Sequence, residues 1–321
     1  MVVCLLRKSL ARWRTGWHVT ALKNLSSNHA LKPLIPTFCL LVVILYGQAD
    51  KLRNFVAGVF IPQYRYPFPV ALCFTQVLVS IVFINLLHAL GLVPLKSYSR
   101  LLGERLLLPS ICSSVHSVLV TWAKASSLYA SLFLFTVPLL PLLTVGFSFA
   151  LRVKSPPSYH SLVLISIMSG MFVVSKASEG DLVVEPLEYL YAPLALILQS
   201  LSLISLAKVS EAEGRPPSNT QATVFDIYYV QLVNQIGVLG LLWLLHPDNP
   251  VEVLRLSTWR HLLFHGYLLA IVLLGMVLNF LVLISALCVS PLAAALLYSA
   301  RAEAFSAYIR DPAASLLQQL L

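Results

Sequence analysis

The chain has 321 residues, of which 58% are hydrophobic and only 11% are charged. A soluble domain carries about 25% charged residues, so this composition excludes an ordinary water-soluble enzyme and indicates a membrane protein. The formal net charge of +9 would suggest nucleic acid in a soluble protein. Here it reflects the basic residues that collect on the cytosolic side of membranes, and no nucleic-acid partner is expected.

Long apolar runs separated by short polar loops follow one another along the chain. They lie near residues 34–49, 66–95, 106–123, 128–151, 159–177, 186–207, 223–245, 261–287 and 289–308. Most are long enough to cross a hydrocarbon core of about 30 Å, which takes about 20 helical residues. The sequence therefore predicts an all-α, polytopic membrane helix bundle of about nine transmembrane helices, with the lipid bilayer as a partner.

The chain divides into three predicted parts: a basic cytosolic segment at 1–32, a transmembrane domain at 33–309, and a short tail at 310–321. Before Asp50 there is no acidic residue, and leucines and tryptophans alternate with basic residues in a helical pattern. This pattern is typical of a mitochondrial presequence and of an interfacial helix on anionic lipid. Both interpretations stay open.

Basic residues predict the orientation of the bundle. With a cytosolic N-terminus and alternating spans, thirteen lysines and arginines fall on the cytosolic side and seven on the other. Because basic residues favour the cytosolic side, this orientation is preferred. It places the loops at 50–66, 123–128 and 176–188 on one side of the membrane and those at 96–106, 152–158 and 208–222 on the other.

Polar residues inside apolar runs indicate where a site lies, because the bilayer makes them costly. The run at 106–123 is the most polar, with Ser110, Ser113, Ser114, His116, Ser117 and Thr121. These side chains either bond neighbouring helices together or line a site.

The later runs carry further polar residues. The run at 223–245 begins with Tyr228, Tyr229, Gln231, Asn234 and Gln235. Asn279 stands alone in the run at 261–287, either as an interhelical hydrogen-bonding group or as part of a cavity wall. Arg301 and Glu303 interrupt the last run, where either the helix ends or one of them faces an aqueous path.

Several different short motifs follow one another in a fixed order over residues 34–305. They are Asp50-Lys51, Tyr66-Pro67-Phe68-Pro69 with Gln76, Pro94 to Arg105, Ser131 with Pro141-Leu142-Leu143-Thr144, Glu179-Gly180-Asp181-Leu182 with Tyr189, Lys208, and Gly275 with Asn279-Phe280. Together they resemble the drug/metabolite transporter superfamily, and within it solute carrier family 35, the nucleotide-sugar and triose-phosphate translocators. The resemblance implies a 5+5 inverted repeat.

Three positions depart from that family. The family's fourth-span lysine falls at Val137, and its seventh-span "FYNN"-like motif is Tyr228-Tyr229-Val230-Gln231. Its ninth-span "GALNK"-like motif falls on residues 299–303, and no tenth span follows. The sequence therefore predicts a divergent member with an incomplete repeat.

The resemblance implies an antiporter that moves a nucleotide sugar or a related phosphorylated metabolite across the Golgi or endoplasmic reticulum membrane. The mitochondrial inner membrane is the alternative location. An anionic substrate needs cations to offset its charge and polar groups to orient it. The expected substrate-binding residues are Lys51, Lys124, Tyr228, Tyr229, Gln231, Asn279, Ser299 and Arg301.

Two other functions stay open. A non-transporting or regulatory member would suit the lost lysine and the missing span. A membrane enzyme would need several histidine boxes, whereas His261 and His265 form one HxxxH pair. The five cysteines are far apart, so neither a disulfide framework nor a zinc site is indicated. No nucleophile motif, P-loop or GxGxxG after a strand occurs, so no metal, cofactor or catalytic residue is expected and the chain is not predicted to be an enzyme. A homodimer is a further candidate partner.

Overall fold

The computed structural model describes residues 46–49, 52–53, 68–126, 136–151, 159–177, 187–213, 223–245 and 261–299, and all regular elements in these ranges are helices. Five helices are long and apolar enough to cross a membrane. They are α4 (Pro69–Ala89), α5 (Arg100–Ser126), α9 (Glu188–Glu213), α10 (Val224–Leu245) and α12 (Leu262–Cys288). The predicted all-helical, multi-pass membrane architecture is confirmed to this extent, and the count of nine spans stays a prediction.

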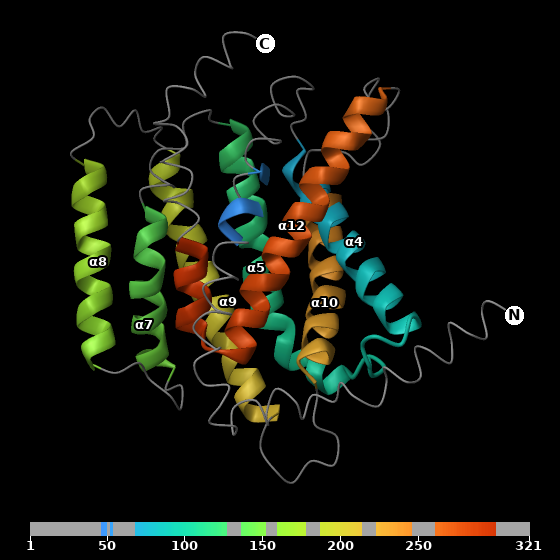
Figure 1. Ribbon diagram of the computed structural model, residues 1–321, viewed down its shortest axis with the longest axis horizontal. Helices are drawn as coiled ribbons and strands as arrows, with labels where there is room; N and C mark the ends of the chain where they lie inside the picture. Colours follow the sequence, from blue (N-terminus) through green and yellow to red (C-terminus); the bar gives the residue numbers. More distant parts are fainter. Residues whose placement is uncertain are drawn as a thin grey trace, which may run out of the picture.

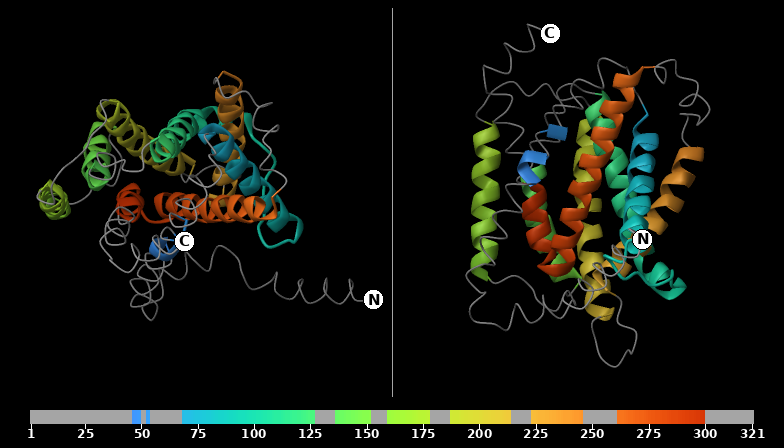
Figure 2. Two further views of the ribbon diagram at one scale, coloured as in Figure 1. Left: turned by 90° about the horizontal axis from the view of Figure 1, so that it is seen from above. Right: turned by 45° about the vertical axis from the view of Figure 1, so that its right-hand side comes forward.

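Three further elements complete the described bundle. The short 3₁₀ helix η1 (Val137–Leu139) leads into α7 (Leu140–Ala150), and α8 (Tyr159–Ala177) follows. The helices stand side by side, with α8 at one edge beyond α7 and with α12 crossing one face obliquely (Figures 1 and 2). α5 occupies the interior, because it packs against α9, α10 and α4.

Helix ends follow local backbone chemistry. Pro69 occupies the first turn of α4, where its missing N–H is no loss. Gly91 adopts φ 72° just after α4, and the N–H groups of Gly91 and Leu92 donate to the carbonyls of His88 and Leu87. This Schellman arrangement closes the helix, so α4 ends before the predicted apolar run does.

Two predicted loops are partly helical. α5 begins at Arg100 and α9 extends to Glu213, so the predicted loops at 96–106 and 208–222 start or end inside helices. Arg100 and Glu104 form an ion pair one turn apart on α5, an arrangement that supports a helix outside the membrane. The loop prediction was wrong here because an apolar run marks the length buried in lipid and not the length of the helix.

Prolines lie inside two of the helices, and two proline carbonyls accept hydrogen bonds from neighbouring helices. Pro193 lies inside α9, and Pro109 lies inside α5. The Ser202 hydroxyl of α9 donates to the Pro109 carbonyl at 3.0 Å, and the Ser169 hydroxyl of α8 donates to the Pro138 carbonyl at 3.0 Å. These hydroxyls thus join α9 to α5 and α8 to η1, as interhelical hydrogen bonds do in membrane bundles.

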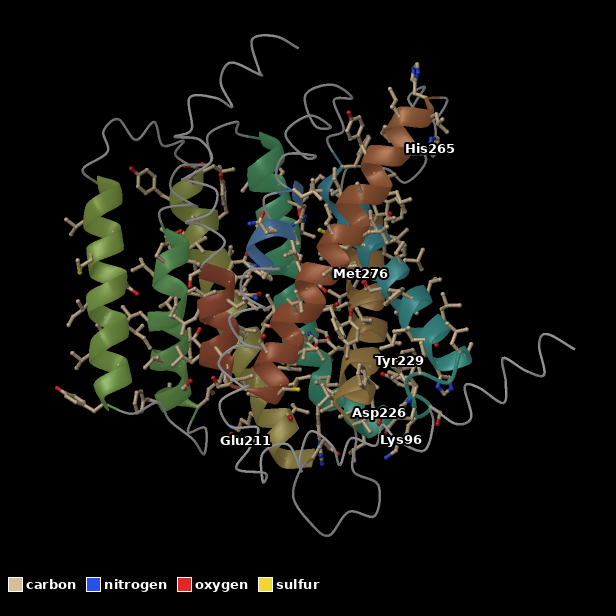
Figure 3. All side chains as sticks on the ribbon, viewed as in Figure 1. Lys96, Glu211, Asp226, Tyr229, His265 and Met276 are labelled. Atoms are coloured by element: carbon tan, nitrogen blue, oxygen red, sulfur yellow. The ribbon has the colours of Figure 1, made fainter. Side chains whose placement is uncertain are left out.

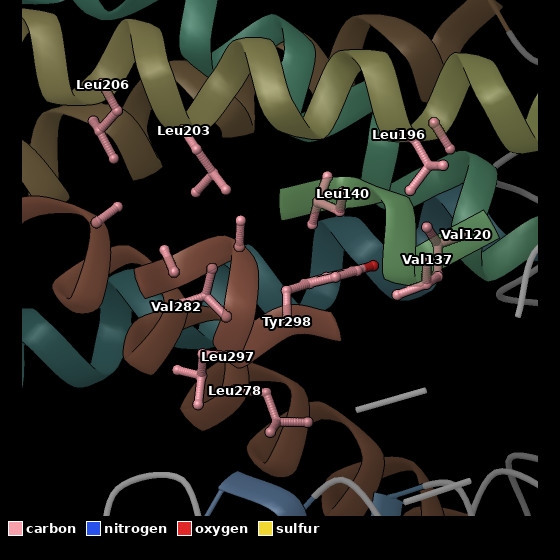
Figure 4. Packing of buried hydrophobic residues seen from close by; sticks show 14 of the residues in the cluster. Val120, Val137, Leu140, Leu196, Leu203, Leu206, Leu278, Val282, Leu297 and Tyr298 are labelled. Carbon is pink, nitrogen blue, oxygen red and sulfur yellow. The ribbon is translucent and has the colours of Figure 1, made fainter. Parts of the chain in front are cut away.

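The largest hydrophobic cluster joins α5, α7, α9, α10, α12 and the helical residues 291–299 (Figure 4). Val137 is part of it and is only 3% exposed. The outer faces also carry large apolar side chains, such as Val82, Met171 and Leu262. An apolar exterior around a packed interior fits lipid as the surrounding solvent.

Candidate functional site

Uncharged polar side chains lie along the contacts that α10 makes with α5 and α4 and along the contact of α4 with α12, and we call them the polar cluster. Its members are Gln76 and Ser80 of α4, Ser110, Ser113 and Ser114 of α5, and Tyr228, Gln231 and Gln235 of α10. Gly275 and Phe280 of α12 pack against it. Met276, the neighbour of Gly275, lies near the middle of the bundle, with His265 towards one end and Lys96, Glu211 and Asp226 at the other (Figure 3).

Contacts between α5 and α10 form one side of the cluster. The Ser110 hydroxyl donates to the Leu106 carbonyl at 2.7 Å and lies 3.4 Å from the Gln231 carbonyl. The Gln235 amide donates to the Ser113 hydroxyl at 3.0 Å. Ser110 and Ser113, three residues apart on α5, therefore both face α10.

Contacts of α4 with α10 and α12 form the other side. A Cβ at Gly275 would lie 2.5 Å from Nε2 of Gln76, so the glycine admits the carboxamide to the backbone of α12. The Tyr228 ring meets the Phe280 ring edge-on, with centroids 5.2 Å apart. The Gln76 side chain is therefore held close to α12 at the level of the cluster.

Two polar atoms in the cluster have no hydrogen-bond partner within the described residues. They are Oε1 of Gln231, whose residue is 2% exposed, and Oγ of Ser114, whose residue is 1% exposed. Buried polar groups are nearly always bonded, and leaving one unpaired costs about 1–3 kcal/mol. The α5–α10 interface therefore contains unused hydrogen-bonding capacity.

Polar groups on the opposite side of α5 are paired. His116 is 4% exposed, its Nδ1 lies 2.8 Å from the Ala195 carbonyl, and its Nε2 lies 3.0 Å from the Tyr298 hydroxyl. Because a carbonyl only accepts, Nδ1 carries the proton, and a neutral ring then accepts from Tyr298 at Nε2. His116 thus joins α5 to α9 and to the helical residues 291–299.

Hydrogen bonds join α10 to the α4–α5 connection at the end of the bundle that holds Lys96. The Asp226 carboxylate accepts the N–H groups of Lys96 and Thr223 at 2.8 Å each, while Thr223 Oγ1 accepts the Asp226 N–H at 3.2 Å. This is a capping box at the start of α10. Asn234 accepts from Tyr98 and donates to the Gly103 carbonyl, so the α4–α5 connection is tied to α10 twice.

The structure places the predicted site residues in different surroundings. Tyr228 and Gln231 are buried in the polar cluster, and Tyr229 is half-buried beside it. Asn279 is exposed on α12, and the Ser299 hydroxyl bonds to carbonyls of its own helix.

The predicted cations are not placed. Lys51 and Arg301 lie outside the described residues. Lys124 belongs to α5, but its side chain also lies outside the described part. The proposed contacts of these cations with phosphate therefore stay predictions.

Six members of the cluster were not among the predicted site residues: Gln76, Ser80, Ser110, Ser113, Ser114 and Gln235. Gln76 is an amide in an otherwise apolar run, which signals an interior polar position. Ser114 is one of many α5 hydroxyls, and only packing distinguishes it from its neighbours. The histidine pair His261 and His265 lies outside the cluster. Both residues are exposed, and His265 Nδ1 lies 3.0 Å from the His261 carbonyl. No group of three metal-ligating side chains occurs among the described residues.

No model of a known protein family matches the chain, and no curated protein shows a significant match to it. The resemblance to solute carrier family 35 therefore enters the account as a proposal.

Proposed function

We propose that the protein is a membrane antiporter that exchanges a nucleotide sugar or a related phosphorylated metabolite across the Golgi or endoplasmic reticulum membrane. The observation that supports this best is the polar cluster, with its unpartnered Gln231 and Ser114 atoms inside a bundle of membrane-type helices. Polar groups at that depth are expensive and usually serve a substrate pathway. The motif resemblance supplies the substrate class.

The positive charge that phosphate binding needs must come from residues outside the polar cluster. Phosphate binding needs cations, and Lys51, Lys124 and Arg301 are the candidates that the resemblance and the sequence supply. Arg301 would contribute a planar, bidentate contact to phosphate. Gln231 and Tyr229 would orient the uncharged parts of the substrate.

The test is exchange by the purified chain in proteoliposomes. Vesicles preloaded with one nucleoside monophosphate each are offered a panel of labelled UDP-, GDP-, CMP- and ADP-sugars. The proposal predicts saturable uptake of at least one nucleotide sugar that depends on the matching internal monophosphate. Arg301→Ala should abolish this uptake without changing insertion, while Arg301→Lys should restore part of it.

A non-transporting or regulatory role is the second candidate. The observation that favours it is Val137, which lies in the hydrophobic core where the resemblance places a lysine. A folded, reconstituted chain that takes up none of the panel would support this second function and reject the first.

The membrane in which the protein resides and its oligomeric state need separate tests. Imaging of a tagged chain against Golgi, reticulum and mitochondrial markers tests the membrane, and a mitochondrial location would support the presequence interpretation. Light scattering of the detergent-solubilised chain tests the expected homodimer.

A further inference from the structure

We infer that the polar cluster binds an uncharged, hydroxyl-rich group, such as the sugar part of a substrate, and that phosphate is held elsewhere. This deepens the proposed function, on which it rests for the larger molecule that carries the group. Gln231 and Ser114 provide unpartnered atoms on facing helices, and Gln76 of α4 adds a second buried amide.

The unpartnered atoms come from helices that are otherwise well joined. Ser110, one turn before Ser114, already bonds to Leu106 and approaches the Gln231 carbonyl. Gln235, one turn after Gln231, bonds to Ser113. Each unpaired residue therefore has a bonded polar neighbour one turn away on its own helix, and the packing of the interface does not explain why these two atoms remain unpaired. A bound group that supplies the missing hydrogen bonds does explain it.

Charge decides what kind of group fits. α4 has no Asp, Glu, Lys or Arg, α12 has none, and the one such residue of α10 is Asp226, at the end of the bundle (Figure 3). Arg105 of α5 is paired with Glu213, and His116 faces α9. An anion placed in the cluster would meet no cation among the described side chains of α4, α5, α10 and α12, and an uncompensated charge at a buried position has a high desolvation cost.

The donors and acceptors of the cluster decide which uncharged group fits it. Oε1 of Gln231 accepts only, whereas the Ser114 hydroxyl donates and accepts and the Gln76 carboxamide presents both functions. A polyhydroxyl group also donates and accepts at neighbouring atoms, so it matches this mixed set. A purely apolar group would leave Oε1 unpaired, and a simple acceptor would repel it.

The alternative occupant is ordered water, which commonly satisfies buried polar groups. Water and a ligand hydroxyl differ in what a substitution does. If water fills the cluster, Gln231→Leu leaves ligand binding unchanged. If a ligand hydroxyl bonds to Gln231, the same variant weakens that ligand and leaves nucleotide recognition intact.

The experiment uses the full chain in detergent, with ligand-dependent thermal stabilisation as a binding assay that does not require transport. The probes are nucleoside monophosphates, the corresponding nucleotide sugars, and free monosaccharides. The variants are Gln231→Leu, Ser114→Ala, and the control Gln199→Leu, which replaces a buried glutamine on α9 outside the cluster.

We expect the parent chain and Gln199→Leu to bind one nucleotide sugar more tightly than its monophosphate. Gln231→Leu should bind that nucleotide sugar about tenfold more weakly, equivalent to about 1.4 kcal/mol, with unchanged affinity for the monophosphate. Equal losses for both probes, or no loss for either, would overturn the inference. So would a parent chain that no sugar-bearing probe stabilises.

Different results would reject the antiporter and the binding of an uncharged group by the polar cluster, which we call the neutral subsite. Uptake in proteoliposomes with no effect of Gln231→Leu rejects the neutral subsite and keeps the antiporter. Sugar-selective binding that Gln231→Leu abolishes, without uptake by the parent chain, rejects the antiporter and keeps the subsite.

Discussion

The two sides of α5 differ in how completely their polar residues are paired. Towards α9, the His116 ring is bonded at both nitrogens and the Ser202 hydroxyl bonds to the Pro109 carbonyl. Towards α10, Ser114 and Gln231 keep atoms without a partner. Polarity inside a membrane bundle therefore does not by itself locate a site. Paired groups join helices, and unpaired ones are the better sign of a ligand.

The largest effect is expected on the paired side. His116→Leu would leave the Ala195 carbonyl and the Tyr298 hydroxyl without these bonds, so we expect the chain to lose about 2–3 kcal/mol of unfolding free energy. Unfolding in mixed detergent micelles measures it, with Ser117→Ala as the control on the same helix. A loss below about 0.5 kcal/mol would show that His116 does not join these helices.

The next effect concerns the tie between α10 and the α4–α5 connection. Asp226→Ala removes the acceptor of the Lys96 and Thr223 N–H groups and should destabilise the fold by about 1–2 kcal/mol. Thr223→Ala, which removes the other half of the capping box, should cost about 1 kcal/mol. If the unfolding of Asp226→Ala matched that of the parent chain, the capping box would not contribute to stability.

A smaller effect is expected where α12 approaches the polar cluster. Gly275→Ala would place a methyl group against the Gln76 carboxamide, and displacing that flexible side chain should cost about 1 kcal/mol. Because the clash is specific to Gln76, Gln76→Ala should remove most of the cost of Gly275→Ala. Additive losses in this double-mutant cycle would contradict the close packing of these two residues.

Much of the fold is predictable from the sequence. The predicted run at 159–177 coincides with α8, and those at 223–245 and 261–287 agree with α10 and α12 within a residue. The ends that differ depend on chemistry that hydropathy does not record, such as the left-handed Gly91 after α4 and the ion-paired start of α5.

The site was less predictable. Gln231 was expected from its depth in an apolar run, and it is buried in the cluster. Asn279 was expected by the same argument and is exposed. A helix that is apolar on all sides has no amphipathic direction, so its rotation is set by packing. Gly275, against which Gln76 packs, is one such determinant on α12.

The most direct test of the contrast between the two sides of α5 is the unfolding free energy of Gln231→Leu without ligand. If Oε1 is unpaired and held ready for a ligand, leucine removes a buried polar group that no protein atom satisfies. The variant should then be at least as stable as the parent chain, by up to about 1 kcal/mol. A loss of about 1 kcal/mol or more would show that Gln231 is paired in the folded bundle like His116, and would contradict the assignment of the polar cluster as a binding site.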